Sequence, residues 1–282
     1  MSISYKKISK CPTIFKRLFG MKVKEFDLIV EKVEIEWEKS VTSSYKRPGR
    51  NYKLGFKEMV MMLLLYYRTY TSQMQIGFMF GIDEANVCRI IKKLEPILAK
   101  IVAISKNREL KKEDVDILID VTEQKIERPE KNQKEYYSGK KKCHTLKTEV
   151  RIDKNGRITN VSKAFLGKTH DFKIHKQSDP LPMNTRVLAD SGYQGLKKLR
   201  KDSKTPIKKK KKKPLTETQK LYNKMISKIR VKIENTFAQI KNFRILSDRY
   251  RNKRKGHNLK FNIIAGITNI KNGFMSKALA AA

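Results

Sequence analysis

Apolar residues recur at helical spacing near the start of the chain. One stripe, at positions i, i+3, i+4, i+7 and i+11, predicts a single clear helix in the first fifty residues: Phe26, Ile29, Val30, Val33 and Trp37. Serine, proline and glycine then gather at residues 43–49 and predict a linker. We therefore expect an N-terminal helical segment and linker over residues 1–50, ahead of a separate module.

Three helices in succession are predicted in that module, residues 51–100. The first is largely apolar at residues 59–67, and the second carries the apolar residues Met74, Ile76 and Phe80. Gly81 supplies a turn, and Asp83 is the predicted N-cap of the third helix.

The third helix has two chemically different faces. Its apolar positions are Val87, Ile90, Ile91 and Leu94. Its polar, basic positions are Asn86, Arg89, Lys92 and Lys93. A short helix, a glycine turn and a helix with a basic outer face describe a helix-turn-helix that contacts DNA. An ordinary three-helix packing unit gives the same pattern, and this alternative stays open.

The periodicity changes after residue 113. An alternating, β-branched run at 115–121 predicts a strand, and Asn-Gly between runs 143–153 and 157–165 predicts a hairpin. The later elements are a strand at 185–189 and helices at 216–246 and 258–270. The long helix carries one apolar stripe: Leu221, Met225, Ile229, Ile233, Phe237 and Ile240. This order predicts an α/β core over residues 113–272 and a tail at 273–282.

The net charge narrows the function. Among 282 residues, Lys and Arg total 65 against 28 acidic residues, a formal net charge of +37. A surface this basic favours a nucleic-acid partner, because each neutralised phosphate releases a counterion. A ribosomal-type binding protein, or an AT-rich genome that favours lysine codons, would give the same excess. The lysine run 208–213 is typical of a solvated loop, and it would direct nuclear import only in a eukaryote.

Cysteine content and hydropathy exclude other classes. The three cysteines, Cys11, Cys88 and Cys143, are scattered, which argues against disulfides and a structural zinc site. No apolar run follows the basic start, so no signal peptide is predicted. The longest apolar stretch, 59–67, is too short to span a bilayer. We expect a soluble, intracellular protein with no membrane partner and no small-molecule substrate.

Three acidic residues stand where charge is costly unless it is used. Asp120 ends the apolar run 117–119, Asp190 ends the run 187–189, and Glu234 lies mid-helix near the apolar stripe. Phosphodiester cleavage by a metal-activated water needs carboxylates around two Mg²⁺ ions about 3.5–4 Å apart. Each acid alone has a structural explanation, as a strand cap, a turn residue or a partner of Arg230. The three in this order are harder to explain as structure.

Neighbouring residues suit the same chemistry. Arg230 lies one turn before Glu234 and Lys241 two turns after it, so one helix face presents an acid and two cations. A simple i,i+4 salt bridge, worth about 0.3–0.5 kcal/mol, is the alternative for Arg230 and Glu234. His170 and Asp171 are accessory candidates beside the metals, and Asp171 is equally suited to be the N-cap of a short helix.

A further candidate segment mixes aromatic residues, a glycine and lysines. It contains Tyr136, Tyr137, Lys140 and Lys141. Aromatic rings stack on bases and lysines hold phosphates, so the segment is a candidate contact with DNA ends. A loop beside an edge strand is the equally weighted alternative.

Several fragments taken together carry a family resemblance. They are Asp120-Val121-Thr122-Glu123, Tyr136-Tyr137-Ser138-Gly139-Lys140-Lys141-Lys142, His144-Thr145-Leu146-Lys147, His170-Asp171, Ala189-Asp190-Ser191-Gly192-Tyr193-Gln194-Gly195 and Arg230-(3)-Glu234-(6)-Lys241. Over residues 113–269 the chain resembles DDE transposases of the insertion-sequence-five-like group, which are related to Harbinger-type nucleases. Ser227 stands where the family signature has tyrosine, so no role of that tyrosine carries over.

The resemblance implies a fold, a site and partners. It implies an RNase H-like core, a mixed sheet flanked by helices, behind an N-terminal helix-turn-helix. It places the catalytic and metal-binding triad at Asp120, Asp190 and Glu234, with two Mg²⁺ ions for which Mn²⁺ can substitute. The partners implied are the terminal inverted repeats and target DNA, bound by a homodimer or larger assembly in the bacterial nucleoid, or in the nucleus of a eukaryote.

Three other functions compete with this one. A DNA-binding regulator or domesticated transposase would keep the helix-turn-helix without nuclease activity. A tyrosine recombinase would use Tyr193 or Tyr222 as its nucleophile and would not need the three acids. A structural RNA-binding protein would leave the strand-end acids unexplained.

Overall fold

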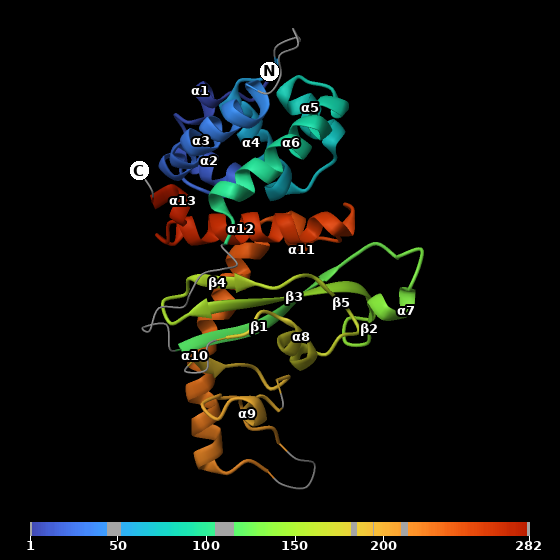
Figure 1. Cartoon of the computed structure of the whole chain (residues 1–282), viewed down its shortest axis with the longest axis vertical. Coiled ribbons are helices and arrows are strands. Elements are labelled where there is room, and N and C mark those ends of the chain that lie inside the picture. Colours follow the sequence, from blue (N-terminus) through green and yellow to red (C-terminus); the bar gives the residue numbers. More distant parts are fainter. Residues whose placement is uncertain are drawn as a thin grey trace. The chain divides into compact units, whose positions relative to one another are not determined.

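The computed structural model describes residues 2–43, 52–104, 116–181, 185–193, 195–209 and 214–280, which fall into two compact units (Figure 1). We call them the helical unit (Met1–Ala103, Ile240–Asp248 and Leu259–Ala282) and the sheet unit (Ile104–Gln239 and Arg249–Asn258). The predicted linker, apart from Ser43, and most of the lysine run 208–213 lie outside the described residues. The units interrupt each other in the sequence, whereas the sequence analysis expected consecutive domains.

The helical unit begins with more helices than the apolar pattern predicts. Two short helices, α1 (Tyr5–Ile8) and α2 (Pro12–Phe19), precede α3 (Val23–Trp37), which ends in the π-helix η1 (Glu38–Thr42). The expectation of a single helix in this region is therefore wrong. The α2 helix has only one buried pair, Phe15 and Phe19, and α1 buries no residue, so neither repeats a stripe long enough to detect.

The predicted helix-turn-helix is present as α4 (Phe56–Thr69), α5 (Gln73–Phe80) and α6 (Glu84–Val102). Ser72 caps α5 by accepting a hydrogen bond from the Gln75 amide, and Gly81 ends it with a left-handed φ of 68°. Asp83 occupies the N-cap position of α6, but its carboxylate accepts from the Asn86 side chain instead of capping the backbone. Of the three apolar residues named for this helix, Ile76 and Phe80 are buried and Met74 is 66% exposed.

C-terminal segments complete this unit. They are α11 (Arg244–Ser247), most of α12 (His257–Lys271) and α13 (Lys277–Ala280). A buried ion pair joins Lys260 of α12 to Glu95 of α6 at 3.0 Å. Gly266 lies so close to α6 that a Cβ there would overlap the Val102 carbonyl, so α12 packs tightly against the helix-turn-helix.

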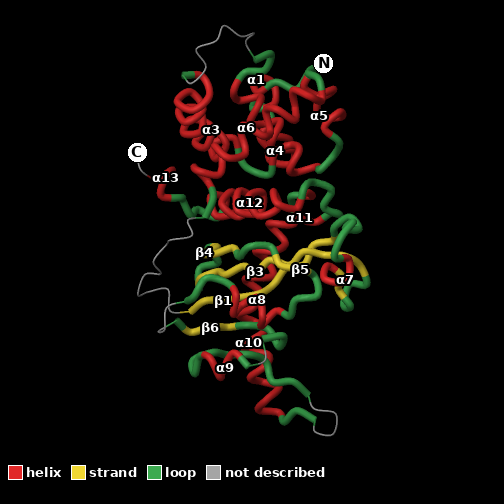
Figure 2. Tube along the Cα trace, turned by 45° about the vertical axis from the view of Figure 1, so that its right-hand side comes forward, coloured by secondary structure: helices red, strands yellow, loops and turns green. Residues whose placement is uncertain are grey.

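The sheet unit is built on a mixed sheet (Figure 2). Among the described residues its strands are β1 (Asp116–Lys125), β2 (Tyr137–Ser138), β3 (Cys143–Asp153), β4 (Ile158–Val161), β5 (Phe165–Leu166) and β6 (Arg186–Leu188). The order is β2-β3-β1-β6, with β3 antiparallel and β6 parallel to β1. The remaining two strands, β4 and β5, pair with β3.

The predicted hairpin joins β3 to β4. Gly156 adopts a φ of 85° in its turn, and Asp153 Oδ1 accepts hydrogen bonds from the Asn155 and Arg157 amides. The second predicted run divides into β4 and β5, and the pairing of β4 with β3 shifts register between Arg151 and Ile152.

Helices complete the sheet unit. They are α7 (Gln133–Tyr136), α8 (Asp171–Gln177), α9 (Leu196–Leu199), most of α10 (Glu217–Lys241) and the 3₁₀ turn η2 (Arg254–Gly256). A core of Ile117, Ile119, Val187, Ala189, Tyr193 and Leu196 joins β1, β6 and the segment after β6.

The long helix α10 departs from the predicted stripe. Leu221 is 65% exposed and Met225 48% exposed, whereas Ile226 and Ile233 are buried. Apolar residues at strict four-residue spacing drift by about 40° per step, so Leu221 and Phe237 lie about 160° apart around the helix. A single packed face cannot bury both ends of such a run.

Candidate active site

The strand pairing brings Asp120 and Asp190 to equivalent positions. The adjacent parallel strands β1 and β6 place Leu118 opposite Leu188, and each aspartate follows two residues later. The expectation that Asp120 ends its strand is wrong, because β1 continues to Lys125 through its pairing with β3. The pairing of β1 with β6 ends before Asp120, whereas the pairing of β1 with β3 continues past it.

A third carboxylate, Asp171, faces the same place. Gly192 lies two residues after Asp190, and its amide donates to Asp190 Oδ1 at 2.7 Å. A Cβ on Gly192 would lie 2.9 Å from Asp190 Oδ1 and 3.2 Å from Asp171 Oδ2. The absence of a side chain at Gly192 therefore leaves a space that both carboxylates border.

Asp171 has a different role from the predicted helix cap. His170 occupies the N-cap position of α8, and Asp171 is the first helical residue. Its Oδ1 atom accepts a hydrogen bond from Lys147 Nζ at 3.0 Å. The N-cap interpretation of Asp171 is wrong, because this long-range ion pair turns the carboxylate toward the sheet.

Asp120 sits in an electrostatically unfavourable environment. Its side chain is only 20% exposed. Burial raises its pKa to about 6, and the Asp190 and Asp171 carboxylates add to this, against the lowering effect of the Val121 amide and Arg230. Arg230 of α10 approaches Asp120 Oδ2 at 3.4 Å, and its Nε is buried with no hydrogen-bond partner in the described residues.

Of the predicted triad, Glu234 is the residue that the structure does not bring into contact with the two aspartates. It lies on α10 one turn after Arg230 and is exposed. Arg230 pairs with Asp120, so an i,i+4 ion pair is not what holds Glu234. Within the described ranges, no group of three or more His, Cys, Asp or Glu side chains is assembled closely enough to hold a metal ion.

Behind the aspartates lies a buried network that sequence reasoning missed. Glu149, which is fully buried, accepts from Arg151 Nε at 2.8 Å and lies 3.1 Å from His175 Nδ1. The Tyr193 hydroxyl donates to the same carboxylate at 3.4 Å. The available signal was two opposite charges between apolar residues of β3, a strand that is buried over most of its length.

Tyr193 connects this network to the aspartates. The side chain is fully buried, and burial raises its pKa well above the ordinary value, with further increases from Glu149, Asp120, Asp171 and Asp190. A buried phenol that resists ionisation cannot reach a DNA phosphate, which argues against Tyr193 as a recombinase nucleophile.

The remaining predicted residues lie on several elements. His170 is exposed, and Lys241, the last residue of α10, belongs to the helical unit. Tyr137 lies in the edge strand β2 and is 45% exposed, and Lys140 and Lys141 lie exposed in the following turn. Tyr136 ends α7, and the Arg254 guanidinium lies over its ring at 4.8 Å.

Comparisons with known proteins decide the family. Residues 119–269 match the family described as DDE superfamily endonuclease, and residues 52–103 match the helix-turn-helix of DDE superfamily endonuclease. The chain belongs to the DDE superfamily endonucleases.

Two relatives agree with this assignment. The chain is 38% identical over 262 residues to a protein of Microchaete diplosiphon named probable transposase for insertion sequence element IS702, covering 90% of this chain and 93% of the relative. It is 24% identical over 237 residues to a Streptomyces albus G protein named putative transposase for insertion sequence element IS112, covering 81% and 84%. No solved structure gives a significant match.

This membership confirms the resemblance and the fold class that it implied: a helix-turn-helix and a mixed sheet flanked by helices, consistent with an RNase H-like core. It also implies DNA binding and dependence on a divalent metal. No helix among the described residues has the length and apolar character needed to cross a membrane.

The residues present suit such a metal in chemistry. Carboxylate oxygens are the preferred ligands of hard divalent cations, and Asp171 and Asp190 border the space left at Gly192. Asp120, beside them, has a pKa raised by burial and further by the Asp190 and Asp171 carboxylates. These carboxylates do not form a closed metal site among the described residues. Glu234, the remaining predicted ligand, lies exposed on α10 one turn after Arg230.

The helix-turn-helix of this DDE endonuclease presents the predicted polar face. Arg89 and Lys92 are exposed, and Asn86 and Lys93 are half-buried. Arg89 donates to Asn86 Oδ1 at 3.1 Å, and Lys93 Nζ donates to the Tyr52 hydroxyl at 3.1 Å.

Proposed function

We propose that this DDE endonuclease is a transposase that binds the terminal inverted repeats of an insertion sequence and catalyses metal-dependent cleavage and strand transfer of DNA. The observation that carries the proposal is the gathering of Asp120, Asp190 and Asp171 beside Arg230 on neighbouring elements of the sheet unit. Three carboxylates that share two cations, Lys147 and Arg230, stabilise no fold by themselves, because like charges in a buried place repel.

We assign the metal-binding roles to Asp120, Asp190 and Glu234, with two Mg²⁺ ions for which Mn²⁺ can substitute. When bound, such ions activate water and neutralise the charge that develops on the phosphate. Asp171, held by Lys147, keeps a further negative charge at the site. Arg230 has an unused buried Nε–H, so it can donate to a phosphate oxygen while it remains beside Asp120.

The helix α6 is assigned to end recognition. Asn86 and Arg89 are the side chains suited to base edges, since Asn pairs with adenine and Arg with guanine. Lys92 and Lys93 are suited to phosphates, as are Lys140 and Lys141 beside the candidate base-stacking residues Tyr136 and Tyr137. Two DNA ends must be processed together in transposition, so we propose a homodimer or larger assembly on DNA.

The test uses the full chain and a duplex that carries the terminal repeats of its element. We expect cleavage with Mg²⁺ or Mn²⁺, none with EDTA, and no covalent adduct between protein and DNA. An adduct, or cleavage in EDTA, would contradict the metal-dependent mechanism. Random duplexes of the same length serve as the control for end recognition.

One observation favours a second candidate, a DNA-binding protein without nuclease activity. Glu234 is exposed and has no contact with the aspartates in the described residues. If Glu234 cannot reach the site even with DNA and metal, the chain would bind terminal repeats without cutting them. Specific binding with no cleavage under every metal condition would select this candidate.

A further inference from the structure

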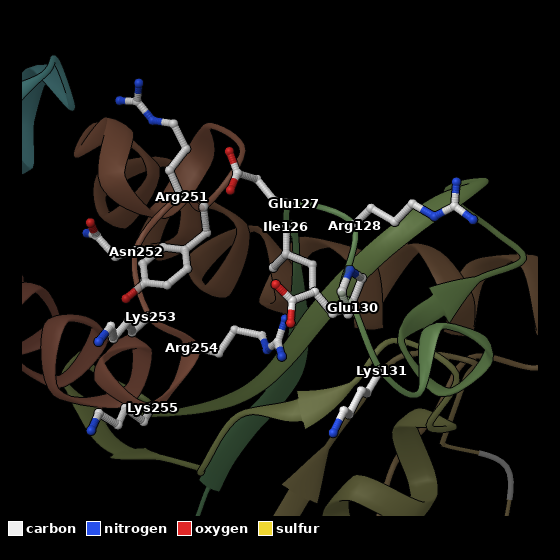
Figure 3. A pocket seen from close by; sticks show the side chains of 12 residues that line it. Ile126, Glu127, Arg128, Glu130, Lys131, Arg251, Asn252, Lys253, Arg254 and Lys255 are labelled. Atoms are coloured by element: carbon white, nitrogen blue, oxygen red, sulfur yellow. The ribbon is translucent and has the colours of Figure 1, made fainter.

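A basic cleft of about 560 Å³ lies in the sheet unit, apart from the aspartates (Figure 3). Its two walls are residues 126–131, which follow β1, and residues 250–255, which precede α12. Six basic side chains line it against two acidic ones, and both acids, Glu127 and Glu130, belong to the first wall. The second wall contributes only cations among its charged residues.

Buried contacts fix both walls to the end of β1. Ile126 forms a parallel bridge with Tyr250, and the Tyr250 amide donates to the Lys125 carbonyl at 2.8 Å. Just outside the cleft, His257 Nε2 lies 2.8 Å from Gln124 Oε1 in a buried contact, and its ring packs edge-on against Tyr250. The cleft is therefore a built part of the fold rather than a gap between loose loops.

Two of the cations, Arg254 and Arg128, are held by uncharged partners. Arg254 extends across the cleft (Figure 3) and lies over the Tyr136 ring, and Arg128 Nε donates to Gln133 Oε1 at 2.9 Å. Lys253 and Lys255 are exposed, and no ion pair of either is found in the described residues. Like charges this close repel one another, so the cleft is best stabilised by a polyanion that spans both walls.

We propose that this cleft binds the phosphodiester backbone of duplex DNA about six base pairs from the cleaved bond, without reading its bases. This rests on the proposed function for the choice of DNA as the polyanion. Contacts of lysine and arginine with phosphate oxygens fix the position of the duplex and carry no base specificity. The cleft is an addition to the DNA contacts of α6 and of Tyr136, Tyr137, Lys140 and Lys141.

The length of chain between Asp120 and Ile126 gives the expected distance between the cleft and the cleaved bond. Ile126 lies six residues after Asp120 along the same strand direction, which is about 20 Å at roughly 3.3 Å per residue. Duplex DNA rises about 3.4 Å per base pair, so the cleft would hold phosphates about six base pairs from the bond that the aspartates address. Arg254 also links the cleft to Tyr136 and so to the segment expected at the DNA end.

The test compares two triple variants of the full chain. One is Lys253→Gln/Arg254→Gln/Lys255→Gln. The matched control removes three exposed lysines from α10 of the same unit, Lys220→Gln/Lys224→Gln/Lys228→Gln. Binding to a 30-base-pair random duplex is measured in EDTA across a range of KCl concentrations. Each phosphate contact contributes about 0.9 to the slope of log affinity against log salt, so we expect the cleft variant to lose roughly 2 to 3 units of slope.

A footprint gives the position of the contact. On a pre-cleaved terminal-repeat duplex, we expect the wild-type chain and the control variant to protect phosphates about six base pairs from the cleaved end. The cleft variant should lose that protection and keep the rest. A cleft variant whose salt slope and footprint match those of the control overturns the proposal and leaves an acidic protein surface as the alternative partner.

The experiments distinguish a failure of the cleft proposal from a failure of the transposase proposal. Binding in EDTA does not depend on cleavage, so a lost slope in a chain that never cuts DNA supports the cleft and contradicts the transposase activity. Normal cleavage with an unchanged slope contradicts the cleft alone. If circular dichroism shows that the triple variant is misfolded, Lys253→Gln/Lys255→Gln keeps the contact of Arg254 with Tyr136 and should lose about two units of slope.

Discussion

Two groups of acidic side chains lie side by side in the sheet unit, and they are compensated differently. Glu149 is one buried carboxylate with an arginine, a histidine and a tyrosine hydroxyl around it. Asp120, Asp171 and Asp190 are three carboxylates that share Lys147 and Arg230. A carboxylate with a full set of partners supports the fold. A group with more negative than positive charge needs a further source of positive charge. For this reason we propose that the metal-dependent chemistry takes place there.

The largest effect should follow the loss of a metal-binding carboxylate. We expect Asp120→Asn, Asp190→Asn and Glu234→Gln each to lower cleavage of terminal-repeat DNA by more than about 100-fold, because even residues that only orient metal ligands are worth 10- to 100-fold. DNA binding should persist, since the phosphate contacts lie elsewhere. Cleavage assays and binding assays on the same preparations measure both.

The control for this set is Asp202→Asn, an exposed acid of the same unit. It should leave cleavage unchanged. A Glu234→Gln variant that cleaves normally would remove Glu234 from the triad and would make Asp171 the next residue to test.

The compensated carboxylate should behave in the opposite way. Glu149→Gln leaves the Arg151 guanidinium buried without its charge partner, so we expect unfolding free energy to fall by about 3–5 kcal/mol. Chemical denaturation measures this. The matched control is Asp116→Asn, which breaks an exposed pair with Arg186 and should cost less than about 1 kcal/mol. Equal losses in the two variants would show that the buried network is not what holds this region.

The under-compensated carboxylate should lower stability when it is charged. The pKa of Asp120 is about 6 in the folded chain against 3.8 ordinarily, so its destabilising effect is absent well below pH 3.8, grows between pH 3.8 and about 6, and is complete above about pH 6. In EDTA, Asp120→Asn should therefore be more stable than the wild type at pH 8 by up to about 3 kcal/mol, and not at pH 4.

Thermal unfolding at the two pH values measures this difference. Adding Mg²⁺ at pH 8 should shrink it, since a cation compensates the charged wild-type site and not the amide. A stability difference that is the same at pH 4 and pH 8 would mean that Asp120 is not strained by its charge.

The smallest expected effect concerns side chains on α6. It tests whether the difference between compensated and under-compensated groups also applies to exposed side chains. Arg89 and Asn86 satisfy each other on α6, as Arg151 and Glu149 do inside the sheet unit, but they are open to solvent. We expect Asn86→Ala or Arg89→Ala to reduce the preference for terminal-repeat over random DNA by about 1–3 kcal/mol. Lys92→Ala and Lys93→Ala should weaken binding to both DNAs about equally.

Binding curves on the two duplexes decide this prediction. If the α6 variants keep full preference and a Tyr136→Ala/Tyr137→Ala variant loses it, recognition lies at the edge of the sheet unit instead.

The sequence is a good guide to features that depend on local pattern. The apolar runs before Asp120 and Asp190 predicted two strands, and Gly81 between apolar helices predicted the helix-turn-helix. These signals lie within a few residues of the feature that they predict.

Features that depend on distant residues were out of reach. Arg230 and Asp120 lie 110 positions apart, and Lys147 and Asp171 lie 24 apart, so no local pattern marks them as partners. The α10 stripe failed for a geometric reason, because four-residue spacing drifts around a helix until its start and end face different ways. The basic cleft is formed by segments that meet only after β1 has paired with Tyr250.

The interleaving of the two units has a consequence for the order in which the chain is made. The helix-turn-helix emerges early from the ribosome, yet Lys260, the buried partner of Glu95, and Gly266, which fits against Val102, are synthesised after the whole sheet unit. The helix-turn-helix thus waits for the sheet unit to be translated before its own packing is complete. A fragment cut at residue 103 would lack the Lys260 ammonium that pairs with Glu95 and the close packing of Gly266 on Val102, so nascent chains that stop early would contain no finished helical unit.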